Sequence, residues 1–296
     1  MTPRAWLLFA ASSVIWGIPY LFIKIALDAG VPPGALAWAR VALGAALMFP
    51  LALRRRAFRG LRARTGPIVA YTACEIAVPF VLIAAGERYL ASSLTAILIS
   101  TMPLFVALLA TLLSTRDRPT GLRSFGLLLG FGGVVALLGV DVAGRHDELL
   151  GAALVLLATV CYAVAPLIVD RYLSDLDPQG PVAASLMVST VALLPAALVR
   201  LPDALPSVAG LAALAVLGIV CTALGLVVFF QLIAATGPTR ASVITYINPL
   251  VAVLAGILFL DERLGTMGIA GMVLILLGSW LSSRREAARP SQRPSV

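Results

Sequence analysis

Three charged residues lie inside long apolar runs of this chain: Lys24, Arg40 and Glu75. A charged side chain within a membrane span is costly, so such residues mark a functional site or an internal ion pair. Side chains of both signs at membrane depth are suited to binding a charged solute or to moving a proton. The first question is therefore what each of them does there.

Glu75 is the most deeply placed carboxylate. It lies about nine residues into the apolar run 66–86, which at 1.5 Å per residue corresponds to roughly 13 Å, close to the bilayer midplane. A carboxylate buried there prefers its neutral form unless a cation pairs with it. Two interpretations follow. Glu75 couples protons or binds a cationic group of a substrate, or it is a structural partner of Lys24 or Arg40.

The two basic residues lie closer to one membrane surface. Lys24 is near the end of the run 5–27, where it either snorkels to the interface or faces a solute. Arg40 is about six residues into the run 34–53, too deep for easy snorkelling. Its planar fork of donors suits a clamp for a carboxylate or phosphate. The alternative is a salt bridge, or a cap on the carbonyls of a neighbouring helix.

Two prolines, Pro103 and Pro249, fall in the middle of apolar runs, where a proline removes a backbone hydrogen bond and bends the helix. Freed carbonyls at membrane depth are tolerated where they are buried in protein or line a wet cavity. Tyr246 and Asn248 lie beside the second proline. They either line such a cavity or satisfy the bent backbone.

The composition shows what surrounds these residues. The chain is 60% hydrophobic and 12% charged, with a mean hydropathy of +1.02, whereas soluble domains carry about 25% charged residues. Most of the chain is therefore predicted to lie in lipid. The net charge of +8 does not indicate nucleic-acid binding, because the charges lie between apolar runs and form no basic face.

A membrane-spanning helix needs roughly 20 apolar residues, and ten segments meet this need. The connections between them are short and rich in glycine and proline, which leaves no room for a soluble domain. The sequence thus predicts an all-α polytopic membrane protein. Its expected spans, numbered 1 to 10 in chain order, are 5–27, 34–53, 66–86, 91–114, 121–140, 149–170, 180–200, 207–235, 238–260 and 265–283.

The chain also repeats itself after 146 positions. Val31-Pro32-Pro33-Gly34 falls on Asp177-Pro178-Gln179-Gly180, and Met102-Pro103-Leu104 falls on Asn248-Pro249-Leu250. Each half holds five spans, and because five is odd the second copy must enter the membrane inverted, as in many secondary transporters. We predict a first repeat at 1–140, a second repeat at 149–283 and a disordered cytoplasmic tail at 284–296.

The repeat separates shared from unshared features. Trp16 corresponds to Tyr162, and both lie well inside their spans rather than at the interface, so they line a cavity or pack between helices. The charges do not correspond, since Lys24, Arg40 and Glu75 fall on Asp170, Leu186 and Cys221. A symmetric scaffold with asymmetric polar groups indicates one central site for an asymmetric solute.

Arginine distribution predicts the orientation. With the N-terminus inside, sixteen arginines lie in inner segments and four in outer ones, which places both termini in the cytoplasm and the chain in the cell membrane. The Arg54–Arg64 cluster serves as this topology signal or binds anionic lipid head groups. Glycine pairs Gly126/Gly133 and Gly271/Gly278 allow close helix contacts, within the chain or in a homodimer.

The sequence contains no motif that indicates a metalloprotein, an enzyme or an ATP-driven pump. The three cysteines lie in apolar runs and the single histidine in a loop, so neither a metal site nor a disulfide framework is predicted. There is no HExxH, no GxSxG and no phosphate-binding Gly-Lys-Ser/Thr loop, so we expect neither an enzyme nor an ATP-driven pump, and no cofactor.

Several features in order resemble the drug/metabolite transporter superfamily, specifically its EamA-type exporters. They are Trp16-Gly17, Lys24, Pro32 followed by Arg40, Pro103-Leu104, Asn248-Pro249-Leu250 and Phe259-Leu260-Asp261-Glu262-Arg263-Leu264 before a glycine-rich last helix. The resemblance covers nearly all of 5–283. Thr115-Arg116-Asp117-Arg118 departs from it, because the family usually shows an acidic Glu-Arg pair there.

The resemblance implies two inverted five-helix repeats and alternating access to a central cavity. Such proteins move small metabolites, often outward. We therefore expect a secondary transporter that exports a small metabolite, an amino acid or similar zwitterion, with Glu75, Lys24 and Arg40 setting charge selectivity and Pro103 and Pro249 giving the bends. An intramembrane enzyme and a non-transporting scaffold are the alternatives.

Overall fold

The computed structural model describes residues 1–113, 121–141, 145–202 and 204–283. Every regular element in these ranges is a helix. The departing segment Thr115-Arg116-Asp117-Arg118 and the predicted tail 284–296 lie outside the described ranges. The α-helices of the first half are α1 (Pro3–Gly17), α2 (Pro19–Asp28), α3 (Pro33–Arg54), α4 (Thr65–Thr72), α5 (Val78–Gly86), α6 (Ser92–Ile99), α7 (Met102–Leu113) and α8 (Leu122–Asp141).

The second half has the same plan. Its α-helices are α9 (His146–Ile168), α10 (Gln179–Ala192), α11 (Leu194–Val199), α12 (Val208–Ala215), α13 (Gly225–Thr236), α14 (Pro238–Ala241), α15 (Ile244–Leu260) and α16 (Thr266–Ser283). Three π-helical segments, Ala73–Ala77, Val169–Leu173 and Val216–Leu224, and a 3-10 turn at Leu61–Arg64 join or extend these helices.

These helices make up the ten predicted spans. Within the described residues, eight helical stretches are long and apolar enough to cross a membrane, and two shorter apolar helices, Leu122–Leu138 and Ile244–Leu260, supply spans 5 and 9. Several spans consist of two helices, because a break or a π-helical segment interrupts them. Span 1, for example, is α1 followed by α2, with Pro19 starting the second piece.

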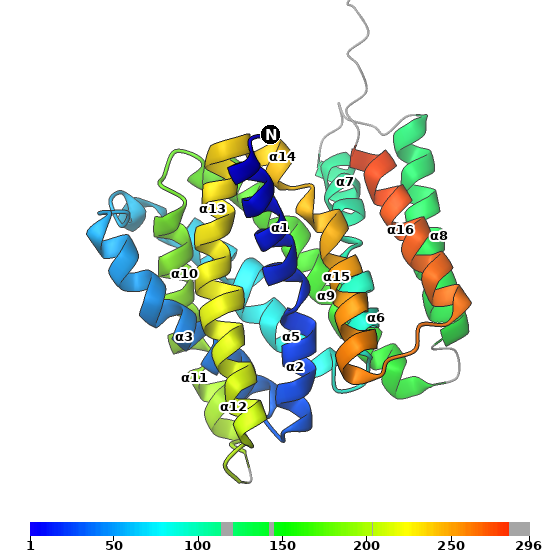
Figure 1. Cartoon of the computed structure of the whole chain (residues 1–296). Helices are drawn as coiled ribbons and strands as arrows, with labels where there is room; N and C mark the ends of the chain where they lie inside the picture. Colours follow the sequence, from blue (N-terminus) through cyan, green and yellow to red (C-terminus); the bar gives the residue numbers. More distant parts are fainter. Residues whose placement is uncertain (114–120, 142–144, 203, 284–296) are drawn as a thin grey trace, which may run out of the picture.

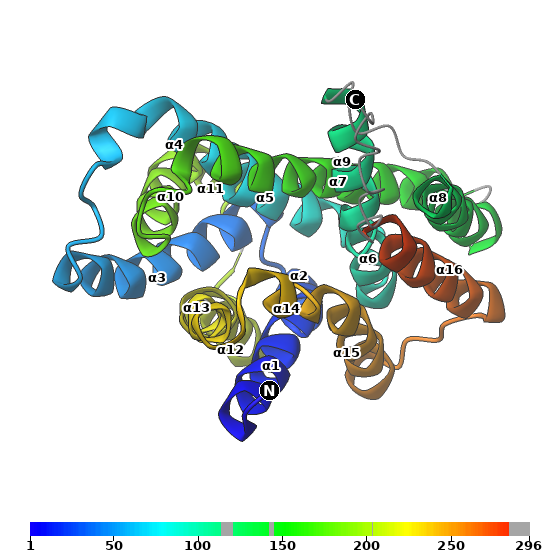
Figure 2. The ribbon, with the colours of Figure 1, turned by 90° about the horizontal axis from the view of Figure 1, so that it is seen from above.

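Each span packs on a span of the other half, and six of the ten pack on their own counterpart. Span 2 packs on span 7 (α3 on α10), span 4 on span 9 (α6 on α15) and span 5 on span 10 (α8 on α16). Span 3 packs on span 6 (α5 on α9), and its mirror image is span 8 on span 1 (α13 on α1). This set of contacts maps onto itself when the halves are exchanged, as inverted repeats require (Figures 1 and 2).

Glycines allow the closest of these contacts. In the pair α8–α16, a Cβ on Gly278 would lie 2.6 Å from the Gly126 carbonyl oxygen, and one on Gly133 would lie 2.9 Å from that of Gly271. Neither position therefore accepts a side chain without moving the partner helix. The two contacts are symmetry mates, so the predicted glycine pairs pack within the chain.

Candidate functional site

The two halves share a deformation of the helix at the same position. Span 3 contains the π-helical turn Ala73–Ala77, and span 8 contains the longer π-helix Val216–Leu224, which covers the same turn after the shift of 146. π-helical insertions are rare and occur often at functional sites. Glu75 lies in the middle of the first, and its counterpart Cys221 lies in the second.

Glu75 lines a wide-open cavity of about 370 Å³ between span 3 and the end of span 6. This size falls within the roughly 300–1,000 Å³ of small-molecule sites. A second carboxylate, Asp170, lines the same cavity, and the remaining lining residues are Tyr71, Pro166, Val169 and Ser174. Asp170 is the symmetry mate of Lys24. The cavity thus has two acidic groups and no basic group among its lining residues.

Neither basic candidate is the structural partner of Glu75. The Lys24 ammonium lies 3.6 Å from an Asp28 carboxylate oxygen and 3.4 Å from the main-chain oxygen of Glu87. Arg40 makes no ion pair with Glu75 either. The structure therefore does not show Glu75 as an ion-pair partner of Lys24 or Arg40, which was one of its two interpretations.

Arg40 is buried and connects three spans. Its Nε donates to the Thr222 hydroxyl at 3.0 Å, and its guanidinium carbon lies 3.9 Å from the ring centre of Phe80. Thr222 belongs to the π-helix of span 8 and in turn donates to the Leu217 carbonyl at 2.8 Å. One nitrogen of the guanidinium fork is thereby used, and its flat face is covered by an aromatic ring, a favourable cation–π geometry.

Trp16 and Tyr162 occupy equivalent places but have different contacts. The Trp16 indole nitrogen donates to the Cys221 carbonyl at 3.2 Å, and its ring packs on Phe229 at 4.5 Å between centres. Tyr162 packs beside the cluster around Ile83 and lies within electrostatic range of both Glu75 and Arg40. Trp16 therefore joins span 1 to the span 8 π-helix, whereas Tyr162 is placed to interact electrostatically with both charged candidates.

The residues near Pro249 bond to protein groups. The Tyr246 hydroxyl lies 3.0 Å from the Ser283 hydroxyl and 3.4 Å from the Ser279 carbonyl, both on α16. With its amide turned to donate, Asn248 reaches the Ile244 carbonyl at 2.9 Å and the Ser13 carbonyl at 3.2 Å. Both side chains thus fasten span 9 to neighbouring spans.

The two prolines occupy unlike surroundings. Span 4 is interrupted at Ser100–Thr101, and Pro103 lies in the first turn of α7 directly after this break. In span 9 the interruption falls earlier, between α14 and α15, and α15 continues through Pro249. A proline in a first helical turn loses no hydrogen bond, whereas one inside a helix does. Near the first break, the Ser279 hydroxyl donates to the Ser100 carbonyl at 3.3 Å.

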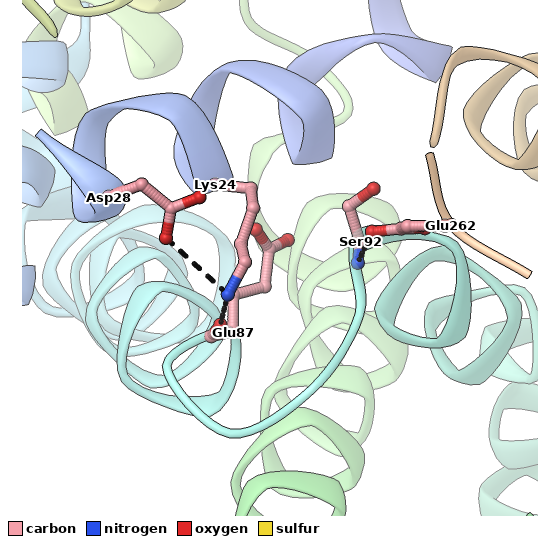
Figure 3. A network of polar contacts seen from close by, with 5 residues as sticks. All are labelled: Lys24, Asp28, Glu87, Ser92 and Glu262. Atoms are coloured by element: carbon pink, nitrogen blue, oxygen red, sulfur yellow. Dashed lines mark hydrogen bonds and ion pairs between the residues drawn. The ribbon is translucent and has the colours of Figure 1, made fainter. Parts of the chain in front are cut away.

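A polar network at the opposite end of the bundle from the N-terminus was not predicted. Figure 3 shows the carboxylate of Glu87 between Lys24 on one side and the Ser92–Glu262 pair on the other. Glu262 accepts hydrogen bonds from the main-chain nitrogens of Ser92, at 2.7 Å, and Ser93, at 3.0 Å, and from the Ser93 hydroxyl. It thus caps the start of α6 from the other repeat.

Only one feature of the sequence indicated this network. The Ser92-Ser93 pair at the start of α6 has no acidic residue three positions later to complete a capping box, and Glu262 supplies the acid from the second repeat. Glu87 directly follows span 3 and reads as an ordinary loop residue, although its side chain is buried. No three residues of the kinds that ligate metals lie together within the described ranges.

The family comparison decides the class of this protein. The model of the EamA-like transporter family matches the chain twice, at residues 3–139 and 149–284. The chain belongs to the EamA-like transporter family. This confirms the predicted duplication and the fold of ten helices in two inverted repeats, and it assigns the chain to a family of transporters rather than of enzymes.

Relatives align along nearly the whole chain. An uncharacterized transporter of Archaeoglobus fulgidus is 27% identical over 95% of this chain and 99% of its own. The uncharacterized inner membrane transporter YedA of Escherichia coli K12 is 26% identical, covering 94% and 92%. A probable terminal-alkyne amino-acid exporter of Streptantibioticus cattleyicolor is 29% identical over 95% of both chains.

The fold has also been solved elsewhere. One crystal structure superposes with a TM-score of 0.65 over 96% of this chain and 97% of its own, at 17% identity. At this identity the match concerns the fold alone. Family, spans and fold together make the chain a multi-pass membrane transporter.

Proposed function

We propose that this transporter exports a small metabolite, an amino acid or a similar zwitterion, across the cytoplasmic membrane by alternating access. The observation that carries the proposal is the cavity lined by Glu75 and Asp170 at the π-helical turn of span 3. Two carboxylates without a basic partner in the lining attract an ammonium group. The relative named as a probable amino-acid exporter supports the same solute class.

The carboxylate of a zwitterion needs a positive group in the site as well. Arg40 is a buried cation, and Tyr162 lies within electrostatic range of both Arg40 and Glu75. Its fork has one nitrogen bonded to Thr222, and its other donors suit a carboxylate. Glu75 would release or take up the proton that accompanies the ammonium group, while Lys24 lies nearer the membrane surface.

The membrane orientation belongs to the same proposal. We place both termini in the cytoplasm, because the arginine-rich connections lie on the same side as the termini and such connections are usually cytoplasmic. The cavity lies between span 3 and the end of span 6, on the half of the bundle toward the N-terminus. It would therefore receive the solute from the cytoplasm, as export requires. The surrounding partners are membrane lipids, and the chain acts alone or as a homodimer.

Counter-flow in liposomes tests the proposal. Purified protein is reconstituted, the vesicles are loaded with one unlabelled amino acid at a time, and uptake of the labelled compound is followed. A carrier gives transient accumulation above equilibrium for at least one zwitterion. Uptake that only equilibrates would indicate a channel, and no uptake across all amino acids and their amines would contradict the proposed substrate class. Glu75→Gln protein is the matched control for the cavity.

A further inference from the structure

The side chain of Glu87 is fully buried, with 0% of its surface exposed. Neither of its carboxylate oxygens has a hydrogen-bond partner among the residues that the structure describes. Lys24 approaches only the main-chain oxygen of this residue, at 3.4 Å. A buried charge without partners is costly, so this arrangement fits the protonated form of the side chain.

The charged and titratable groups that face Glu87 come from three elements. Helix α2 contributes Tyr20, Lys24 and Asp28, helix α3 contributes Arg40, and the connection after α15 contributes Glu262. Arg88 follows Glu87 in the chain, but its guanidinium lies 6.0 Å from the ring centre of Tyr89. Glu87 lies just beyond the end of span 3, and burial raises its pKa well above the usual range, while Lys24 lowers it in part.

Glu262 is the other carboxylate near Glu87, and it makes the contact with the start of α6. The turn that presents it is unusual, because Asp261 has the left-handed φ of +53° and the Glu262 nitrogen donates back to the Gly256 carbonyl at 3.2 Å. Gly256 also leaves room for the contact between the Glu262 carboxylate and the Ser93 hydroxyl, because a Cβ at Gly256 would clash with both groups. The Glu262 cap on α6 is therefore a built contact that holds the two repeats together at this end.

We propose that Glu87 is a proton-binding site that controls this contact. When Glu87 is protonated, the Glu262 carboxylate remains on the α6 nitrogens and the end of the bundle opposite the N-terminus stays closed. When Glu87 loses its proton, its buried carboxylate faces the half-buried carboxylate of Glu262, and Lys24 is attracted from Asp28 toward Glu87. Repulsion then weakens the cap, and this end opens as the pH rises.

A distance measurement across the contact tests this inference without any substrate. Spin labels are placed at Arg88 and Thr266, which are exposed on the two sides of the contact, in a variant whose native cysteines Cys74, Cys161 and Cys221 are replaced. The label distance is recorded in lipid nanodiscs over a pH series. The distance should lengthen with rising pH in this reference protein.

The variants separate the groups involved. Glu87→Gln should hold the short distance at every pH, and Glu262→Gln should also abolish the pH response because the second charge is gone. Asp28→Asn removes the competing partner of Lys24 but leaves both Glu87 and Glu262, so it should keep the response with its midpoint at a lower pH. Glu87→Asp retains a carboxylate and should shift the midpoint rather than abolish the response.

A reference protein without a pH response would overturn the proposal. So would an unchanged response in Glu87→Gln, or a response lost in Asp28→Asn. If Glu87→Gln protein does not fold, the Glu87→Asp midpoint decides, because an unshifted midpoint would contradict a proton site at this residue. The counter-flow experiment is independent of these outcomes, since it depends on the substrate cavity rather than on the distance between the labels.

Discussion

Spans 3 and 8 are the same helix built twice with different side chains. Both contain a π-helical turn at the equivalent position, yet span 3 places Glu75 there beside a cavity, whereas span 8 places Cys221 there against Trp16. Arg40 likewise bonds to the span 8 turn and has the apolar Leu186 as its counterpart. The backbone deformation is shared, but the chemistry is not.

This difference indicates which features carry the fold and which carry the function. Contacts that occur in both halves, such as the glycine pairs of α8 and α16, are needed by any inverted repeat. Groups that occur in one half only break the symmetry, and a solute with distinct ends requires such asymmetry. Changing a shared feature should therefore impair folding, and changing an unshared one should impair transport.

The largest effect is expected at a shared contact. Gly278→Ala places a Cβ against the Gly130 nitrogen and 2.6 Å from the Gly126 carbonyl oxygen, and since both are backbone atoms, the helices must separate. We expect a loss of stability of roughly 3 kcal/mol, the upper part of the range for overpacking. Thermal unfolding in detergent measures it.

Gly132→Ala is the control, because nothing lies within 4 Å of a Cβ at that position of the partner helix α8. It should leave stability unchanged or raise it slightly, since alanine favours the helix. Equal destabilisation by both substitutions would show that the close glycine contact is not what holds α8 against α16.

The next effect is expected at the unshared carboxylate. Glu75→Gln should lower counter-flow about a hundredfold, or roughly 2.7 kcal/mol, and should remove the pH dependence of what remains. The amide keeps the shape of the side chain but neither attracts an ammonium group nor exchanges a proton. Initial rates over a pH series give the result.

The counterpart substitution Cys221→Ser should leave the rates within twofold. Unchanged pH dependence in Glu75→Gln would remove the proton-coupling role from Glu75. A similar loss in both variants would mean that the π-helical turns, rather than the carboxylate, matter for transport.

A smaller, solute-dependent effect is expected at Arg40. Arg40→Ala should weaken transport of an anionic solute by about tenfold, or 1.4 kcal/mol, and of a cationic one much less. Thr222→Val removes only the hydroxyl that accepts from Arg40 and retains the charge, so it should affect both solutes alike. Competition by anionic and cationic analogues in counter-flow measures the ratio, and equal losses in Arg40→Ala would assign Arg40 a structural role.

Much of the fold could be predicted because it depends on local and periodic signals. Apolar length defined the spans, and the shift of 146 defined the pairing of the halves. The π-helical turns could not be predicted, since an inserted residue in a helix leaves no fixed sequence pattern. The break in span 9 was also placed differently, because Pro249 is tolerated inside α15 while the interruption falls at 242–243.

The site was harder to predict because its partners are distant in sequence. Their depth in the predicted spans identified Glu75 and Arg40 as candidates. The hydrogen-bond acceptor for Arg40, however, lies on span 8, and the second cavity carboxylate, Asp170, lies at the end of a predicted span. Glu87 and Glu262 lie at helix ends, where charges are ordinary. Only their three-dimensional contacts distinguish them from solvated loop residues.

The smallest effect compares the two equivalent aromatic residues. Trp16→Phe removes the hydrogen bond to the Cys221 carbonyl but keeps a ring against Phe229, and should cost about 1 kcal/mol of stability. Tyr162→Phe removes a hydroxyl that makes no hydrogen bond within the described ranges, so its stability should change by less than about 0.5 kcal/mol. Its counter-flow should fall, however, if this hydroxyl faces the solute between Glu75 and Arg40. Unfolding and transport measured on both variants thus test whether Trp16 stabilises the helix packing while Tyr162 contacts the solute. A transport loss in Trp16→Phe without destabilisation would contradict this assignment.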